Sequence, residues 1–134
     1  MMYIYELDLK VRDYECDLQG IVNNSNYQRY YEHTRHEFLL EQGVSFSDLH
    51  DEGIDTMVAR IEIAYKTPLK PRDEFTSKLY VSKEGIKYMF HQALYRKRDN
   101  KLCSTAKVTT VITINGVLTA DFEPFDKLCG QSKR

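Results

Sequence analysis

The residues best suited to chemistry lie between positions 14 and 27, where an acid precedes a glycine and a run of small polar side chains. Asp17 stands in a polar loop, and Gly20 follows it three residues later. Ser25 and Gln28 then fit the Ser-x-x-Gln form of a capping box, which predicts a helix beginning near Ser25. Free backbone N–H groups and the positive end of a helix dipole would then lie close to the acid. A carboxylate beside such donors can attack a carbonyl and stabilise the resulting oxyanion. The alternative is an ordinary capped helix after an Asx-rich turn.

The composition favours one domain spanning residues 1–134 and excludes several classes of protein. The 19 basic and 20 acidic residues nearly balance, so we expect no binding to nucleic acid or to an anionic membrane surface. No apolar run approaches the roughly 20 residues of a membrane span, and the N-terminus lacks the features of a signal peptide. Cys16, Cys103 and Cys129 are odd in number and widely spaced. These features predict a reduced, cytoplasmic protein without a metal or other cofactor.

The longest helical pattern runs from about Ser25 to Gln42, and Gly43 follows in the position expected after a last turn. At 3.6 residues per turn one stripe is rich in aromatic side chains and is predicted to face the core. That stripe consists of Tyr27, Tyr30, Tyr31, Thr34 and Phe38. Its phenol groups need polar partners if they are buried. The opposite face carries Arg29, His33 and His36.

Most of the remaining chain alternates between apolar and polar residues, which predicts β-strands. The expected strands cover residues 3–11, 57–65, 75–81, 86–94, 102–114 and 117–122. A short helix is expected over 45–50, and one helical turn after Pro124. Two strands of about 13 residues would span roughly 40 Å each, so the sheet must twist and curl. The sequence therefore predicts an α+β domain in which an antiparallel sheet of five or six strands wraps a long helix.

The loop and the start of the helix contain the run Asp17-x-x-Gly20-Ile21-Val22-Asn23-Asn24-x-Asn26-Tyr27, followed by Tyr31-Glu32-x-x-Arg35. This motif resembles the signature of hotdog-fold acyl-CoA thioesterases, and most closely that of the 4-hydroxybenzoyl-CoA thioesterase group. A segment from Ile61 to Asp73 is also similar to the second strand and loop of that family. The order of strand, loop, long helix and several antiparallel strands extends the resemblance over nearly the whole chain, and implies the hotdog fold.

The resemblance implies a role for each matching residue. Asp17 would act as the nucleophile on the thioester carbonyl, or as the base that activates water. The backbone N–H of Asn24 would polarise the carbonyl, and Gly20 would let the loop pack closely against the substrate. Other positions implied to contact substrate are Ile21, Val22, Asn23 and Tyr27, together with Val58, Ala59 and Arg60 contributed by a second subunit. Asn23 and Asn24 replace the aromatic residue and the histidine or tyrosine of many relatives.

The implied protein is a homodimer or homotetramer that hydrolyses an acyl-CoA to the free acid and CoA. An acyl-carrier-protein thioesterase, a non-hydrolytic acyl-thioester binder and a hotdog dehydratase remain alternatives. A dehydratase commonly uses a loop histidine, and this loop has none.

Other side chains have less specific interpretations. Glu32 is the second candidate for the catalytic carboxylate, or is structural and paired with Arg35 or with a loop group. Cys16 has no histidine nearby in the sequence, and His33 and His36 have no further ligand at metal spacing. Basic residues near the hairpin ends are expected at the surface, where some could bind CoA phosphates: Lys83, Lys87, Arg96, Lys97, Arg98 and Lys101.

Overall fold

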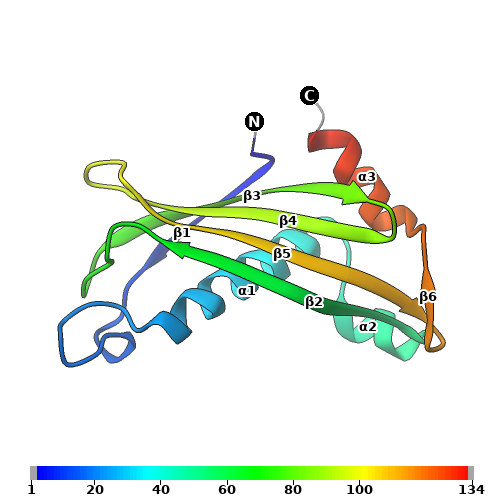
Figure 1. Cartoon of the computed structure of the whole chain (residues 1–134), viewed down its shortest axis with the longest axis horizontal. Helices are drawn as coiled ribbons and strands as arrows, with labels where there is room; N and C mark the ends of the chain where they lie inside the picture. Colours follow the sequence, from blue (N-terminus) through cyan, green and yellow to red (C-terminus); the bar gives the residue numbers. More distant parts are fainter. Residues whose placement is uncertain (1–2, 133–134) are drawn as a thin grey trace.

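The computed structural model describes the backbone of residues 3–132 and the side chains of residues 3–129 (Figure 1). One long helix, two shorter helices, a single 3-10 turn and six strands follow one another along the chain. Their order is β1 (Tyr5–Lys10), η1 (Asp13–Glu15), α1 (Asn24–Glu41), α2 (Phe46–Asp51), β2 (Ile54–Tyr65), β3 (Glu74–Glu84), β4 (Lys87–Arg96), β5 (Leu102–Ile114), β6 (Val117–Thr119) and α3 (Glu123–Ser132).

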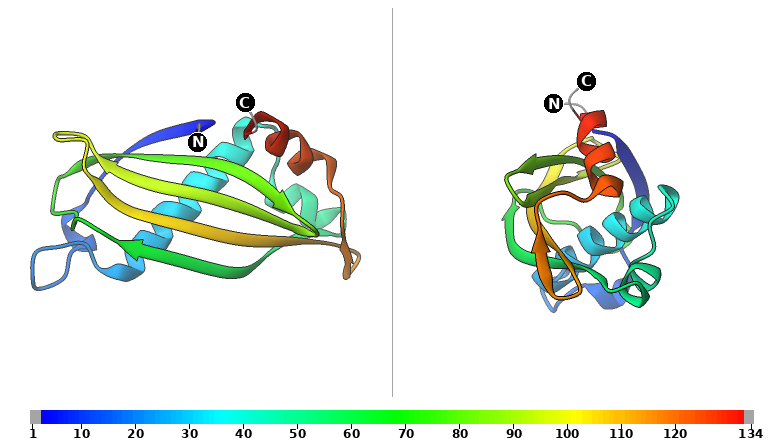
Figure 2. Two further views of the ribbon diagram at one scale, coloured as in Figure 1. Left: turned by 45° about the horizontal axis from the view of Figure 1, so that its top comes forward. Right: turned by 90° about the vertical axis from the view of Figure 1, so that its right-hand side faces the viewer.

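All six strands belong to one antiparallel sheet that curves around α1 (Figure 2). The strand order is β1-β3-β4-β5-β2, and the short β6 pairs with β5. Because β5 pairs only one edge of β2, the other edge of this 12-residue strand is free within the described chain. The architecture confirms the expected α+β hotdog fold, with a long helix held in a curled sheet.

Most predicted boundaries agree with the structure, and the disagreements have local causes. Strand β5 has the predicted bounds, and α1 is displaced by one residue at each end. Strand β2 begins three residues before Met57, and β6 ends at Thr119 rather than near residue 122. The prediction of one helical turn after Pro124 is wrong, because α3 is 10 residues long. Pro124 lies in the first turn of α3, where its missing N–H removes no helical hydrogen bond.

The predicted unbroken alternation of β2 is also wrong. A β-bulge shifts the register between Val58 and Arg60: Val58 pairs with Thr110, whereas Arg60 pairs with Thr109. The extra residue, Ala59, places Val58 on the same face of the sheet as Ile61, because an inserted residue reverses the alternation that follows.

The sequence-predicted stripe of α1 faces the sheet, and the opposite face is solvated. Tyr27, Tyr30, Tyr31, Thr34 and Phe38 are all buried, whereas Arg29, His33 and His36 are exposed. None of the helices within residues 3–132 combines the length and the apolar character needed to cross a bilayer.

Two apolar clusters lie at opposite ends of α1, and polar side chains separate them. The loop-end cluster includes Val22, Tyr27 and Leu69, while the far-end cluster includes Phe90 and Phe125. Between them, buried polar residues of α1 bond to the sheet. Thr34 Oγ1 lies 2.7 Å from Ser77 Oγ, Arg35 Nη1 donates to Gln92 Oε1 at 3.0 Å, and Gln92 Nε2 donates to the carbonyl of Tyr31 at 3.1 Å. We call these residues (Thr34, Arg35, Ser77 and Gln92) the polar belt.

Candidate active site

The loop between β1 and α1 presents Asp17 to solvent through a compact turn. The N–H of Asp17 donates to the carbonyl of Ile21 at 2.9 Å, and its own carbonyl accepts from the N–H of Gly20 at 3.0 Å. The carboxylate Oδ1 accepts the N–H of Gln19 at 2.8 Å, and no donor among the described residues bonds to Oδ2. Gly20 has φ of 76°, a conformation that side chains disfavour, so the turn requires glycine there.

The N-terminus of α1 differs from the sequence prediction in its cap. Asn23, not Ser25, is the N-cap residue, and its Oδ1 accepts the Ser25 N–H at 3.0 Å and the Ser25 hydroxyl at 2.9 Å. The Ser25–Gln28 capping box is therefore wrong, because Ser25 already lies inside the first turn. Asn24 is the first helical residue, and within residues 3–132 its backbone N–H has no hydrogen-bond acceptor. An unoccupied donor at a helix N-terminus is available to an oxyanion.

Glu15 joins the loop to the helix, a role that the sequence interpretation missed. Its buried carboxylate accepts the Tyr30 hydroxyl at 2.7 Å and the Arg12 backbone N–H at 2.8 Å. Its carbonyl accepts the N–H of Asn23 at 3.0 Å and the side-chain amide of Asn26 at 2.8 Å. Burial and the neighbouring carboxylate raise the pKa of Tyr30, so its phenol stays protonated and donates. The sequence contains one indication of the contact between Tyr30 and Glu15, because a buried tyrosine needs a polar partner for its hydroxyl.

The segment that follows β2 packs against the Asp17 loop and the first turn of α1 through Leu69. The carbonyl of Leu69 accepts the Val22 N–H at 2.9 Å, and the Leu69 N–H donates to the Tyr27 hydroxyl at 3.2 Å. Val22 and Tyr27 were expected to contact substrate, but their side chains are buried in this packing. Ile21 is partly buried, and Asn23 is exposed beside the turn.

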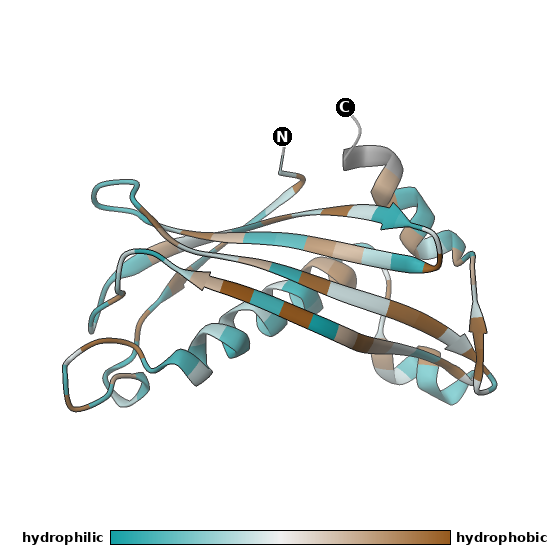
Figure 3. Ribbon diagram, viewed as in Figure 1, coloured by the Kyte–Doolittle hydropathy of each residue, from teal (hydrophilic) through white to brown (hydrophobic). Residues whose placement is uncertain are grey.

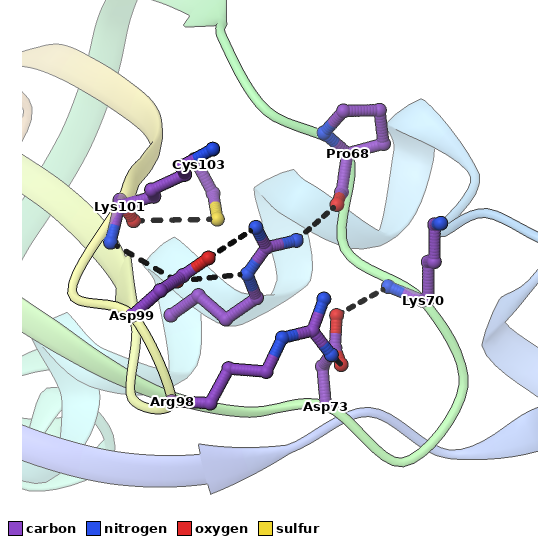
Figure 4. A network of polar contacts seen from close by, with 8 residues as sticks. Pro68, Lys70, Asp73, Arg98, Asp99, Lys101 and Cys103 are labelled. Carbon is purple, nitrogen blue, oxygen red and sulfur yellow. Dashed lines mark hydrogen bonds and ion pairs between the residues drawn. The ribbon is translucent and has the colours of Figure 1, made fainter.

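Charged residues fix the supporting segment in turn (Figure 4). Arg96 forms a two-pronged pair with Asp99, with N–O distances of 3.0 and 2.7 Å, and reaches the carbonyl of Pro68 at 3.5 Å. Asp73 accepts the backbone N–H of Lys70 at 2.9 Å and the guanidinium of Arg98 at 2.9 Å. The expectation that Arg96 is a surface residue is wrong, since it is only 6% exposed.

The structure does not bring every expected site residue together. Asp17, Gly20 and Asn24 share one loop at one end of the molecule. Val58 and Arg60 lie instead at the bulge in the middle of β2, on its free edge. If they contribute to this site, they must do so from another copy of the chain.

The other candidate residues lie in three different environments. Cys16 is partly buried, and burial together with nearby carboxylates raises its pKa, which disfavours the reactive thiolate. Glu32 is exposed on α1, and no described ion pair joins it to Arg35, which bonds to Gln92 instead. His36 packs its ring against Phe46 at 4.8 Å between centroids.

A cavity of about 450 Å³ lies at the other end of α1, between α1, α2 and β2. Its apolar wall consists of Leu39, Phe46, Ile54, Val58, Phe90 and Phe125, and polar side chains line the rest. The lining residues begin at Glu32, so none comes from the Asp17 loop. In Figure 1 the loop preceding α1 and the helix α2 lie at opposite ends of the molecule.

Comparison with known proteins agrees with this architecture. Among curated proteins, the chain is 32% identical over 108 residues to the chloroplastic acyl-acyl carrier protein thioesterase ATL2 of Arabidopsis thaliana, covering 80% of this chain and 57% of that protein. It is 41% identical over 75 residues to a putative esterase of Aquifex aeolicus, covering 56% of this chain and 57% of that protein. The chain spans about half the length of the curated relatives it matches.

Solved structures share the same fold. A hypothetical protein from Aquifex aeolicus superposes with a TM-score of 0.84 at 26% identity, covering 93% of this chain and 98% of that one. A 1,4-dihydroxy-2-naphthoyl-CoA thioesterase from Synechocystis gives a TM-score of 0.88 over 97% of this chain and 98% of that one, and its 11% identity supports the fold alone. The family model of the thioesterase-like superfamily matches residues 11–125, from the end of β1 into α3. This chain belongs to the thioesterase-like superfamily.

Proposed function

We propose that this protein is an acyl-CoA thioesterase that uses Asp17 to hydrolyse the thioester. The observation that supports this most is the pairing of two groups in one loop. Asp17 is a solvent-exposed carboxylate on a fixed turn, and Asn24 offers an unoccupied backbone N–H at the start of an 18-residue helix. Thioester hydrolysis needs an oxygen nucleophile and a stabilised oxyanion, and these two groups supply both.

In the general-base route, Asp17 takes a proton from water while the water oxygen bonds to the thioester carbon. The carbonyl oxygen becomes an oxyanion that accepts the Asn24 N–H. Collapse breaks the C–S bond, releasing the carboxylic acid and the CoA thiolate, which takes up the proton. In the nucleophilic route, Asp17 itself bonds to the carbon and expels the thiolate, and water then hydrolyses the mixed anhydride. Single turnover in H₂¹⁸O identifies the nucleophilic route if ¹⁸O enters the protein, which occurs when water attacks the Asp17 carbonyl of the anhydride. Attack on the acyl carbonyl labels the released acid in either route, and hydroxylamine trapping then detects the anhydride.

The proposal includes a homodimer formed through β2, which could pair further into a tetramer. Strand β2, whose outer edge is free within the described chain, contains several apolar residues, which appear as brown bands along its ribbon in Figure 3. Met57, Val58, Ile61 and Tyr65 are 53%, 49%, 38% and 46% exposed. A long apolar edge strand normally needs a partner.

A two-fold axis through the middle of β2 would pair two such edges antiparallel. Because the Asp17 loop and α2 lie at opposite ends of the folded molecule, this pairing would bring the loop of one copy toward the cavity of the other (Figure 1). It would also bring Val58, Ala59 and Arg60 close to the partner's active site.

Acyl carrier protein is the second candidate for the acyl carrier, and one observation favours it. Two curated relatives are named acyl-acyl carrier protein thioesterases. Hydrolysis of the same acyl group presented on CoA and on acyl carrier protein decides between the two carriers through the ratio of kcat/KM values.

We place the reaction in the cytoplasm, in keeping with the free thiols of Cys16 and Cys103.

The decisive experiment measures thiol release from a panel of acyl-CoAs by wild type, Asp17→Asn and Glu32→Gln. We expect Asp17→Asn to reduce kcat by at least about a hundredfold with the fold retained, because the variant lacks the attacking or proton-accepting oxygen. Asp13→Asn is the matched control, since Asp13 is an exposed acid of the neighbouring turn whose nearest cation, Arg72, is 3.7 Å away. Full activity in Asp17→Asn with loss in Glu32→Gln would transfer the catalytic role to Glu32. No turnover on either carrier would favour a non-hydrolytic binder.

A further inference from the structure

Arg35 combines deep burial with an incomplete set of partners. It is 8% exposed, in the polar belt, and its one described hydrogen bond is the 3.0 Å contact from Nη1 to Gln92 Oε1. No carboxylate of the described residues lies within ion-pair distance of it, although Glu32 favours its charged form through space. A guanidinium has five N–H donors, so most of the Arg35 donors have no acceptor among the described residues.

The remaining donors of Arg35 are accessible rather than sealed in the core. Among the described residues, no side-chain nitrogen or oxygen is both fully buried and without a partner. The unbonded N–H groups of Arg35 therefore reach open space, and Arg35 lines the 450 Å³ cavity beside α2. Burial lowers the pKa of Arg35 to about 10, so the group still carries its charge at neutral pH. The cavity thus holds a charged hydrogen-bond donor in its wall.

The other charges of the cavity indicate which kind of acceptor fits. Glu32 and Asp55 also line it, so two carboxylates stand against the one guanidinium. Asp55 already contacts His50 at 2.6 Å. A further anion brought in by a ligand would be repelled by these two carboxylates, whereas an uncharged oxygen would accept from Arg35 without that repulsion.

We propose that Arg35 binds an uncharged oxygen substituent, an oxo or hydroxyl group, on the acyl chain of the substrate. The inference rests on the proposed function, and makes Arg35 a specificity-determining residue for the thioester that the partner's Asp17 would attack. The apolar wall, with Phe90 and Phe125, receives the hydrocarbon. At roughly 30 Å³ for each group of water size, the cavity holds an acyl group of about eight to twelve carbons with space to spare.

The test uses CoA thioesters of equal length: octanoyl, 3-oxooctanoyl, 8-hydroxyoctanoyl and suberyl. The same acyl groups on acyl carrier protein replace them if the enzyme requires that carrier. The variants are Arg35→Met and Gln92→Leu, which remove the donor and the group that orients it. Arg29→Met is the matched control, since Arg29 is exposed on the same helix and does not line the cavity.

For wild type and Arg29→Met we expect kcat/KM for at least one oxygenated substrate to exceed that for octanoyl by about tenfold to a hundredfold, the range of hydrogen bonds to charged groups. In Arg35→Met the ratio should fall to near one, and in Gln92→Leu it should be intermediate. Equal turnover of octanoyl and oxygenated substrates by wild type would overturn the proposal. So would a preference that persists in Arg35→Met, or a preference for suberyl over the uncharged substrates.

A binding measurement keeps this inference separate from the catalytic proposal. Calorimetric titration of wild type and Arg35→Met with octanoate and 8-hydroxyoctanoate measures the contribution of Arg35 without any turnover. Tighter binding of the hydroxy acid by wild type alone would support the inference even if no thioester were hydrolysed. Equal dissociation constants for the two acids, together with unselective hydrolysis, would refute it while leaving the thioesterase function intact.

Discussion

The side chain of Asp17 accepts one hydrogen bond from its own turn, whereas the loop around it is fixed by several. Glu15, Asn23 and Asn26 tie the loop to the first turn of α1 through their side chains or carbonyls. The loop that carries the carboxylate is therefore fixed, and the proposed oxyanion donor is a backbone N–H that no ordinary side-chain replacement removes. Proline is the one residue that would remove this donor, because it has no backbone N–H.

Asn24→Pro should abolish most activity with little effect on the fold. Asn24 is the first helical residue, where proline is favoured, and Asn23 has φ of −65° and ψ of 141°, which suits a residue before proline. We expect kcat to fall about 10²- to 10³-fold, as when an oxyanion donor is lost. Asn24→Ala keeps the N–H and should retain activity within a few-fold. Equal kcat values for the two variants would exclude the Asn24 N–H as the donor.

Tyr30→Phe should destabilise the protein, because it leaves the buried Glu15 carboxylate without its phenol donor. Removing one partner of a buried hydrogen bond to a charged group costs about 1–3 kcal/mol. Urea unfolding measures the change, and Tyr14→Phe serves as control because Tyr14 is 78% exposed. If both variants unfold at the same urea concentration, Glu15 does not anchor the loop.

At the scale of elements, the long periodic segments could be predicted and the irregular ones could not. The alternation over 102–114 and the stripe from Tyr27 to Phe38 both arise because one face of the element is buried. The spacing of apolar residues in the sequence shows such a face directly. The bulge at Ala59 depends on how β2 meets β5, so the sequence of β2 alone does not contain it. The contact of the buried Arg96 with the exposed Asp99 depends likewise on the return of the chain at a hairpin. The loop site was recognisable because Asp17, Gly20 and Asn24 are near neighbours in sequence.

The Arg96–Asp99 pair, which fixes the segment beside the candidate active-site loop, should make the stability of the protein sensitive to acid. Its hydrogen bonds lower the pKa of Asp99 from 3.8 to about 2. A depressed folded-state pKa contributes stability above pH 3.8, and this contribution is lost as the pH falls toward about 2. The free energy of unfolding of wild type should therefore decline more steeply from pH 4 to pH 2 than that of Asp99→Asn. Parallel declines would show that the pair adds no pH-dependent stability.

At the scale of the whole molecule, activity should depend on assembly. Met57→Lys places a charge on the free edge of β2, where it would disfavour pairing of two copies. We expect sedimentation velocity to show dissociation at concentrations where wild type is dimeric, with a matching loss of specific activity. Leu118→Lys is the control, because Leu118 is similarly exposed but lies on β6. A fully active monomer would overturn the shared site.

The polar belt across the middle of α1 divides the interior into two apolar compartments that share few side chains. Substitutions around Phe90 and Phe125 can change the volume of one compartment while Tyr27, Leu69 and the Asp17 loop keep their packing in the other. If the proposals above hold, the two functions that a thioesterase must combine, bond cleavage and choice of acyl group, lie in separate parts of one short chain. Such a protein can acquire new substrates through mutations that leave its reaction chemistry untouched, which makes the far-end compartment the natural target for laboratory evolution.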